Sequence, residues 1–187
     1  MTRQLKCLSE ACEIWGADID ARSIYWCKQY LQPPFHFFAM TTIPHLPFED
    51  GYFSLIYAGS VFTHIDDLAD AWLLELRRVF SPRGRLYITI HDNHTMDLLD
   101  REYNHTWLSK TICAGDFYNS VRKTGGKIVL GRDSNSQVFY DIDYFSWMLD
   151  LMYDLMSVTS EAYDYQTGIL LKHKPKRMNE GHRSTKT

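Results

Sequence analysis

The sequence lacks an apolar run long enough to cross a membrane, and its first residues (MTRQLK) lack the apolar core of a signal peptide. It also lacks an excess of basic residues, because 20 Lys and Arg stand against 23 Asp and Glu, a formal net charge of -3. We therefore expect a cytoplasmic protein with neither a membrane nor a nucleic acid as its partner.

The four cysteines lack any C-x-x-C spacing; they are Cys7, Cys12, Cys27 and Cys113. This favours buried, reduced thiols over a disulfide framework or a zinc site, and we predict no metal. At 187 residues the chain is long enough for one compact domain. We place that domain at residues 1–173 and expect a disordered basic tail at 174–187.

Strand and helix signals alternate along the first half of the chain, which favours an α/β fold with an open, mostly parallel sheet. We expect strands at 13–18, 35–39, 53–58 and 85–90. We expect helices at 21–31, capped by Asp20, and at 67–80, followed by a turn at 81–84. The second helix carries one apolar face, formed by Leu68, Trp72, Leu76 and Val79.

The second half of the chain has weaker signals. Helical pieces are expected near 96–103 and 117–122, and a helix at 144–153 follows the capping residue Asp141. Strands at 156–162 and 168–172 are separated by a short polar segment. The sheet should therefore end in an antiparallel hairpin.

Asp18 is the first residue with a candidate chemical role. A carboxylate at the carboxyl end of a parallel strand faces the crevice where open α/β sheets bind ligands, and it can accept two hydrogen bonds from a ribose diol. Asp18 could instead cap the following helix, a role that Asp20 could also fill. The residues alone leave both interpretations open.

Four segments in order resemble successive motifs of class I S-adenosylmethionine (SAM)-dependent methyltransferases of the type 11 kind. They are GADID (16–20), LPFEDGYFSLIY (46–57), SVFTHI (60–65) and LRRVFSPRGRL (76–86). The resemblance covers about residues 13–92. It implies a Rossmann-like methyltransferase sheet and SAM as the cofactor.

The resemblance also implies roles for individual residues. Asp18 would bind the ribose hydroxyls of SAM, and Ile19 would lie against one face of the adenine. Thr42 and Ile43 would lie near the adenine edge. The loop formed by Ala58, Gly59 and Ser60 would lie beneath the methionine part of the cofactor.

Two histidines are the candidate catalytic residues. His64 could accept a proton or contact the substrate, but it could also be a structural histidine before the next helix. His91 opens the segment HDNH (91–94), which we interpret first as a substrate-side loop, then as plain surface and last as a metal site.

Glycine is absent from the twelve residues before Glu13. The resemblance implies a first, central strand and a glycine-rich turn in front of this position, and the strand is apparently missing. Two inner strand edges would then be exposed. Either the sheet closes up, a partner chain fills the gap, or the polypeptide is a fragment of a longer gene product.

Three functions follow from these observations. The first is SAM-dependent methyl transfer to an undetermined acceptor, a small molecule or a glycan. The second is a non-catalytic methyltransferase-fold remnant or partner subunit with weak or no SAM binding. The third is a nicotinamide-dependent oxidoreductase, because Asp18 could equally serve an NAD ribose; segments 46–48 and 60–64 speak against it.

Overall fold

The computed structural model describes residues 2–113, 125–131 and 136–175. The chain divides into two compact units, Met1–Pro47 and Phe48–Thr187, which are described separately. The expected single domain at residues 1–173 stays a prediction.

The first unit contains a short parallel β-α-β arrangement. A 3₁₀ helix at Thr2–Leu8 precedes β1 (Trp15–Asp18), α1 (Ala21–Leu31) and β2 (His36–Ala39). Strands β1 and β2 pair in parallel, so that Asp18 lies opposite Ala39 at their carboxyl ends. Ile24 of α1 packs with Phe35 and Phe37 in a small core. A helix over a parallel strand pair agrees with the alternation in the sequence.

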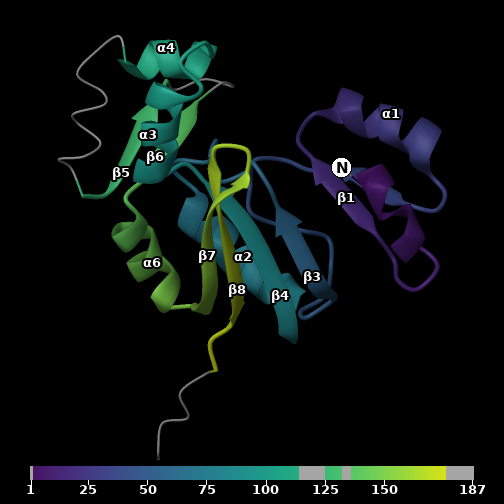
Figure 1. Cartoon of the computed structure of the whole chain (residues 1–187). Helices are drawn as coiled ribbons and strands as arrows, with labels where there is room; N and C mark the ends of the chain where they lie inside the picture. The colour runs from purple at the N-terminus through teal and green to yellow at the C-terminus, as the bar shows by residue number, and fades with distance from the viewer. Residues whose placement is uncertain (1, 114–124, 132–135, 176–187) are drawn as a thin grey trace, which may run out of the picture. The chain divides into compact units, whose positions relative to one another are not determined.

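The second unit is built on a four-stranded sheet in the order β3-β4-β8-β7 (Figure 1). Its strands are β3 (Phe53–Ala58), β4 (Phe80–Ile90), β7 (Tyr153–Tyr163) and β8 (Gln166–His173). The β3–β4 pair is parallel, whereas β4–β8 and β7–β8 are antiparallel. The α/β class and the C-terminal antiparallel hairpin are therefore confirmed.

One face of this sheet forms the main core. Leu86, Ile88 and Ile90 of β4 are fully buried, as alternate residues of one strand face must be. Helix α2 (Ala69–Val79) packs on β4 and buries Trp72 and Leu76, as the helical spacing predicts. Leu68, predicted on the same face, precedes the helix and is exposed.

Smaller elements surround the sheet: α3 (Asn93–Arg101), α4 (Trp107–Cys113), the antiparallel pair β5 (Lys127–Leu130) and β6 (Gln137–Tyr140), and α6 (Ile142–Asp150), capped by Asp141. The predicted helical piece at 117–122 lies outside the described residues. A second core cluster joins α3, α4 and β6; it contains Met96, Leu99, Leu108, Ile112 and Phe139.

Two sequence predictions are wrong. The expected turn at 81–84 is part of β4, whose pairing with β3 shifts register between Phe53 and Leu55 and so accommodates the extra residues. The cysteines were expected to be buried, but Cys7 and Cys12 are exposed and Cys27 is half-buried. Their segments contribute few buried side chains, since the 3₁₀ helix buries none.

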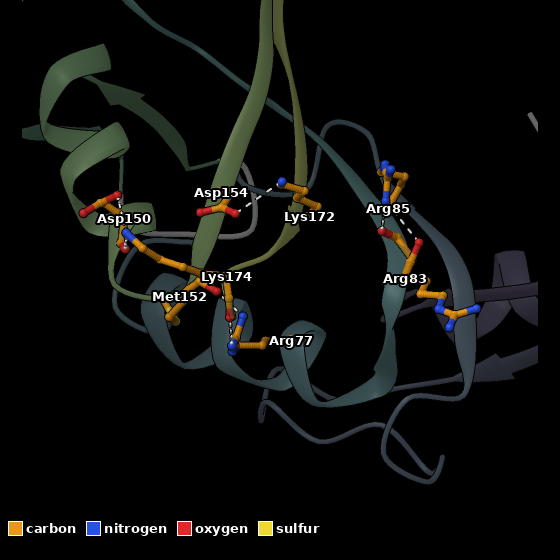
Figure 2. A network of polar contacts seen from close by, with 9 residues as sticks. Arg77, Arg83, Arg85, Asp150, Met152, Asp154, Lys172 and Lys174 are labelled. Carbon is orange, nitrogen blue, oxygen red and sulfur yellow. Dashed lines mark hydrogen bonds and ion pairs between the residues drawn. The ribbon is translucent and has the colours of Figure 1, made fainter. Parts of the chain in front are cut away.

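Polar contacts fasten the ends of β7 and β8 to the helices (Figure 2). Arg77 of α2 donates to the carbonyl oxygens of Met152 and Lys174, the latter at 2.9 Å. Lys174 Nζ lies 2.6 Å from Asp150 Oδ1. Lys174, which the sequence placed in the tail, is thus tied to α6; residues 176–187 lie outside the described part of the chain.

In the described part of the chain, β1 pairs only with β2, and β3 pairs only with β4. Among the described residues, each of these parallel pairs therefore has an edge of β1 or β3 that pairs with no other strand. Strand β3 contains no charged residue and no proline, and Leu55 and Tyr57 are 62% and 42% exposed. Natural edge strands are usually protected by charged residues or prolines, which β3 lacks.

Candidate functional site

Asp18 ends β1, at the carboxyl end of the parallel pair. The backbone N–H of Asp20 donates to Asp18 Oδ1 at 2.9 Å, and the N–H of Met40 donates to the Asp18 carbonyl oxygen at the same distance. The Asp18 side chain is exposed. A carboxylate in this position is available to a ligand outside the strand ends.

The two roles that the sequence left open for this acidic pair are divided between Asp18 and Asp20. Asp20 is the N-cap of α1, because it accepts from the Arg22 N–H at 3.0 Å and from Ser23 Oγ at 2.7 Å. These hydrogen bonds, first that from Ser23, lower the pKa of Asp20. Helix α1 therefore has its cap without Asp18.

A shallow groove of about 330 Å³ lies at the end of β2, lined by Phe38, Ala39, Met40, Thr41, Ile43, His45 and Pro47. Ala39, which lines the groove, is the register partner of Asp18, although Asp18 itself is not a lining residue. Ile43 and Ile19 are 66% and 60% exposed. Thr42 is exposed in the same loop but does not line the groove.

The second unit contributes the segment after β3. Ala58 is buried, Gly59 follows, and Ser60 is half-buried with a φ of +56°. A Cβ on Gly59 would collide with the Tyr57 hydroxyl, so the close approach requires glycine. This tight bend brings the Ser60 N–H within 2.7 Å of Thr89 Oγ1.

The rest of this segment is attached to β5 and β6. The Val138 N–H donates to the Thr63 carbonyl oxygen at 2.8 Å, and the Tyr140 hydroxyl donates to Ile65 at 3.1 Å. Lys127 Nζ lies 2.6 Å from Asp66 Oδ1. Residues 63–66 are thus held by contacts with both strands of the β5–β6 pair.

His64 is exposed on this segment, and its Nδ1 lies 2.9 Å from the Ser136 carbonyl oxygen. Because a carbonyl oxygen can only accept, Nδ1 carries a proton and donates it. In the neutral ring Nε2 is then the unprotonated nitrogen. His64 therefore presents a proton acceptor at the carboxyl end of β3.

His91 follows β4 and is 1% exposed, between the rings of Phe139 and Tyr165 at 4.9 and 5.7 Å. Neither ring nitrogen has a hydrogen-bond partner among the described residues. Burial, with a smaller contribution from the charge of His64, lowers the pKa of His91 to about 3. The two predicted histidines are thus close enough to interact, and His91 is neutral at pH 7.

The HDNH segment shows no sign of a metal centre. His94 Nε2 contacts Glu161 Oε1 at 3.0 Å, and Asp92 caps α3. Across residues 2–113, 125–131 and 136–175, no group of three His, Cys, Asp or Glu residues is placed to hold a metal ion.

Sequence reasoning missed two buried polar residues behind the Ala58–Ser60 bend. Thr89 interrupts the apolar run of β4, a signal that could have been noticed. Gln166 begins β8, and nothing in the local sequence distinguishes it. Thr89 Oγ1 donates to Gln166 Oε1 at 2.5 Å, and Gln166 Nε2 donates to Ser60 Oγ at 3.1 Å.

Comparisons with known proteins agree with this arrangement. Residues 1–88 match the family model described as a methyltransferase domain. Among solved structures, a SAM-dependent methyltransferase from Methanosarcina mazei is 16% identical, with a TM-score of 0.62 over 92% of this chain and 87% of that one. Curated protein sequences gave no match.

The chain has a Rossmann-like methyltransferase fold. A putative type 11 methyltransferase from Sulfolobus solfataricus is 14% identical, with a TM-score of 0.53 over 100% of this chain and 85% of that one. A Burkholderia thailandensis 1,6-didemethyltoxoflavin-N1-methyltransferase with bound S-adenosylhomocysteine is 9% identical, with a TM-score of 0.59 over 92% and 66%. At these identities the likeness shows the fold alone.

No helix in the described part of the chain is long and apolar enough to cross a membrane.

Proposed function

We propose that the protein binds SAM and transfers its methyl group to an acceptor. The observation that carries this proposal is the position of Asp18, an exposed carboxylate at the carboxyl end of β1 that is not needed as the cap of α1. The methyltransferase fold makes SAM the ligand of first choice, and that fold supports the ribose role of Asp18 over the NAD alternative.

The residues present fit the nucleoside end of this cofactor. Asp18 would accept hydrogen bonds from the ribose hydroxyls. Ile19 and Ile43, both exposed, offer apolar surface for the adenine, and Thr42 offers a hydroxyl and backbone groups. Ala58, Gly59 and Ser60 would contact the methionine part through their backbone.

For methyl transfer the main task of the protein would be to orient the acceptor toward SAM. Bound SAM would supply a methyl group on a positively charged sulfur, which transfers by in-line displacement once the acceptor is aligned. His64 would accept the acceptor's proton at Nε2. His91, which is buried and neutral, would contact an acceptor only after the ring of Phe139 or Tyr165 moved aside.

The acceptor we propose is a small molecule or a glycan, in a cytoplasmic protein. The support is the exposed His64 after β3, whose Nε2 can accept a proton from a hydroxyl or amino group of such an acceptor.

A second candidate function is a non-catalytic methyltransferase-fold protein that binds SAM weakly or not at all. It is favoured by the edge of β3, an uncharged strand with two large exposed side chains. A partner chain that adds a strand at this edge would complete the sheet by β-augmentation.

A titration followed by backbone amide NMR tests the proposal. Adding SAM should shift the amides of Asp18, Ile19, Thr42, Ile43 and the Ala58–Ser60 bend, while NAD at equal concentration should leave them unchanged. Shifts confined to other residues would contradict the assigned site. An equal response to NAD would favour the oxidoreductase.

A further inference from the structure

A closed set of hydrogen bonds lies behind the bend at Ala58–Ser60. The Ser60 N–H donates to Thr89 Oγ1 at 2.7 Å, and Thr89 Oγ1 donates to Gln166 Oε1 at 2.5 Å. Gln166 Nε2 donates back to Ser60 Oγ at 3.1 Å. Thr89 therefore uses its hydroxyl as both acceptor and donor, and Gln166 uses both ends of its amide.

These hydrogen bonds converge on Ser60, a residue with an unusual backbone conformation. Ser60 has a φ of +56°, in the left-handed region that side chains other than glycine, asparagine and aspartate rarely adopt. Such a conformation persists where the surroundings impose it, and it is commonest at ligand sites. Ser60 is held by contacts at its N–H, from Thr89, and at its Oγ, from Gln166 at 3.1 Å and from Thr63 Oγ1 at 3.4 Å.

The contacts come from the interior of the sheet. Thr89 is fully buried on β4, and Gln166 is 6% exposed at the start of β8. A buried polar group is kept only where its hydrogen bonds are made, because an unpaired one destabilises the fold. The hydrogen bonds to Ser60 and to each other therefore offset the free energy lost when Thr89 and Gln166 are removed from water.

Gln166 also connects the bend with the second candidate histidine. Its neighbour Tyr165 packs against the His91 ring and accepts a hydrogen bond at its carbonyl oxygen from Thr95 Oγ1 at 2.7 Å. The turn of the β7–β8 hairpin thus holds Ser60 through one residue and contacts His91 through the residue before it.

We propose that Thr89 and Gln166 are positioning residues that lock Ser60 in the left-handed conformation and so fix the cofactor-binding bend. The functional part of this proposal rests on the proposed function, since it assumes that SAM contacts Ala58–Ser60. The hydrogen bonds themselves do not depend on it.

The chain offers a matched control. Thr167 is as buried as Thr89, at 0% exposure, and its Oγ1 has no partner in the described residues. Thr89→Val and Thr167→Val therefore make the same chemical change, but only the first removes hydrogen bonds of the set. Thr89→Ser keeps the hydroxyl and should behave like the unchanged protein.

Hydrogen exchange of the Ser60 amide measures the lock directly. In the full chain, Thr89→Val should speed this exchange about tenfold relative to the amides of β4, as expected for the loss of one hydrogen bond, whereas Thr167→Val and Thr89→Ser should not. Gln166→Leu should have an effect in the same direction. Equal exchange in Thr89→Val and Thr167→Val would overturn the proposal.

SAM affinity tests the functional part. By NMR titration, Thr89→Val should weaken binding about tenfold while Thr167→Val leaves it unchanged. If Ser60 exchange responds as expected but the affinities of the two variants are equal, the lock stands and its role in cofactor binding is overturned. No SAM response in the unchanged chain would instead contradict the proposed function, and the exchange comparison would still decide the lock.

Discussion

Asp18 and Asp20 are two residues apart and have different partners. Asp20 is engaged by Arg22 and Ser23 as the cap of α1, while the contact that Asp18 makes through its side chain is the N–H of Asp20. A test by mutation can therefore separate a ligand role from a structural one at neighbouring positions.

Asp18→Ala should weaken SAM binding by at least about tenfold, because a carboxylate that accepts from ribose hydroxyls makes charge-assisted hydrogen bonds. Calorimetry or NMR titration measures the effect. Asp20→Ala is the control and should lower the melting temperature through the lost helix cap. If Asp18→Ala leaves the affinity unchanged in a chain that binds SAM, the ribose assignment is wrong.

His91 makes a prediction about pH. Its pKa in the folded protein is lowered to about 3 by burial, against 6.5 for an ordinary histidine. Between these values the unfolded chain binds the proton and the folded chain does not, so acidification destabilises the fold. Below pH 6.5, His91 therefore lowers the free energy of unfolding by up to about 1.4 kcal/mol for each pH unit.

The comparison with His91→Phe isolates this effect from the carboxylates that titrate in the same range. Urea unfolding between pH 7 and pH 4 should show a steeper loss of stability in the unchanged protein than in the variant. Parallel curves for the two proteins would show that His91 is solvated or paired in the folded state.

At the scale of elements, α2 packs on β4 with one face and exposes the other to solvent. Trp72 is 5% exposed on its buried side, whereas Leu74 is 56% exposed on the other. Trp72→Ala should therefore lower the free energy of unfolding by about 3–5 kcal/mol, and Leu74→Ala by less than about 0.5 kcal/mol. Denaturant unfolding measures both, and similar losses would mean that the buried face of α2 is wrongly assigned.

The elements that the sequence predicted well are those with local signals. Helix α1 has its bounds as predicted, because Asp20 caps its start and prolines follow its end. Strands β5 and β6 were missed, since they depend on each other and on contacts such as that of Val138 with Thr63. The turn expected at 81–84 became strand because pairing with β3 overrides the local preference of proline and glycine.

The candidate site likewise has residues that the sequence could reveal and residues that it could not. Asp18 could be found from its place at the end of a strand, and Gly59 from its place in the bend. Thr89 and Gln166 could not be linked to Ser60, because their hydrogen bonds span 29 and 106 positions of sequence. The neutral state of His91 likewise comes from Phe139 and Tyr165, which lie far from it in the chain.

At the scale of the whole molecule, each parallel strand pair keeps an edge. Strand β3 pairs only with β4 in the described part of the chain, and it lacks the charges and prolines that protect natural edges. We infer that a parallel strand added at β3 would cover this edge and supply backbone contacts to SAM. Each backbone hydrogen bond that such a strand makes to SAM should add about 0.5–1.5 kcal/mol to binding, so two or three of them would tighten binding at least about tenfold.

The most direct measurement is a calorimetric titration of SAM into the 187-residue chain and into a version extended upstream by an apolar strand and a glycine-rich turn. The control is the same extension with proline at alternate strand positions, which cannot pair along the ladder. We predict that the short chain and the proline control bind SAM, and that the extended chain binds it more tightly and has a higher melting temperature. No SAM binding by any of the three chains, or equal affinity in the short and the extended chain, would contradict the account.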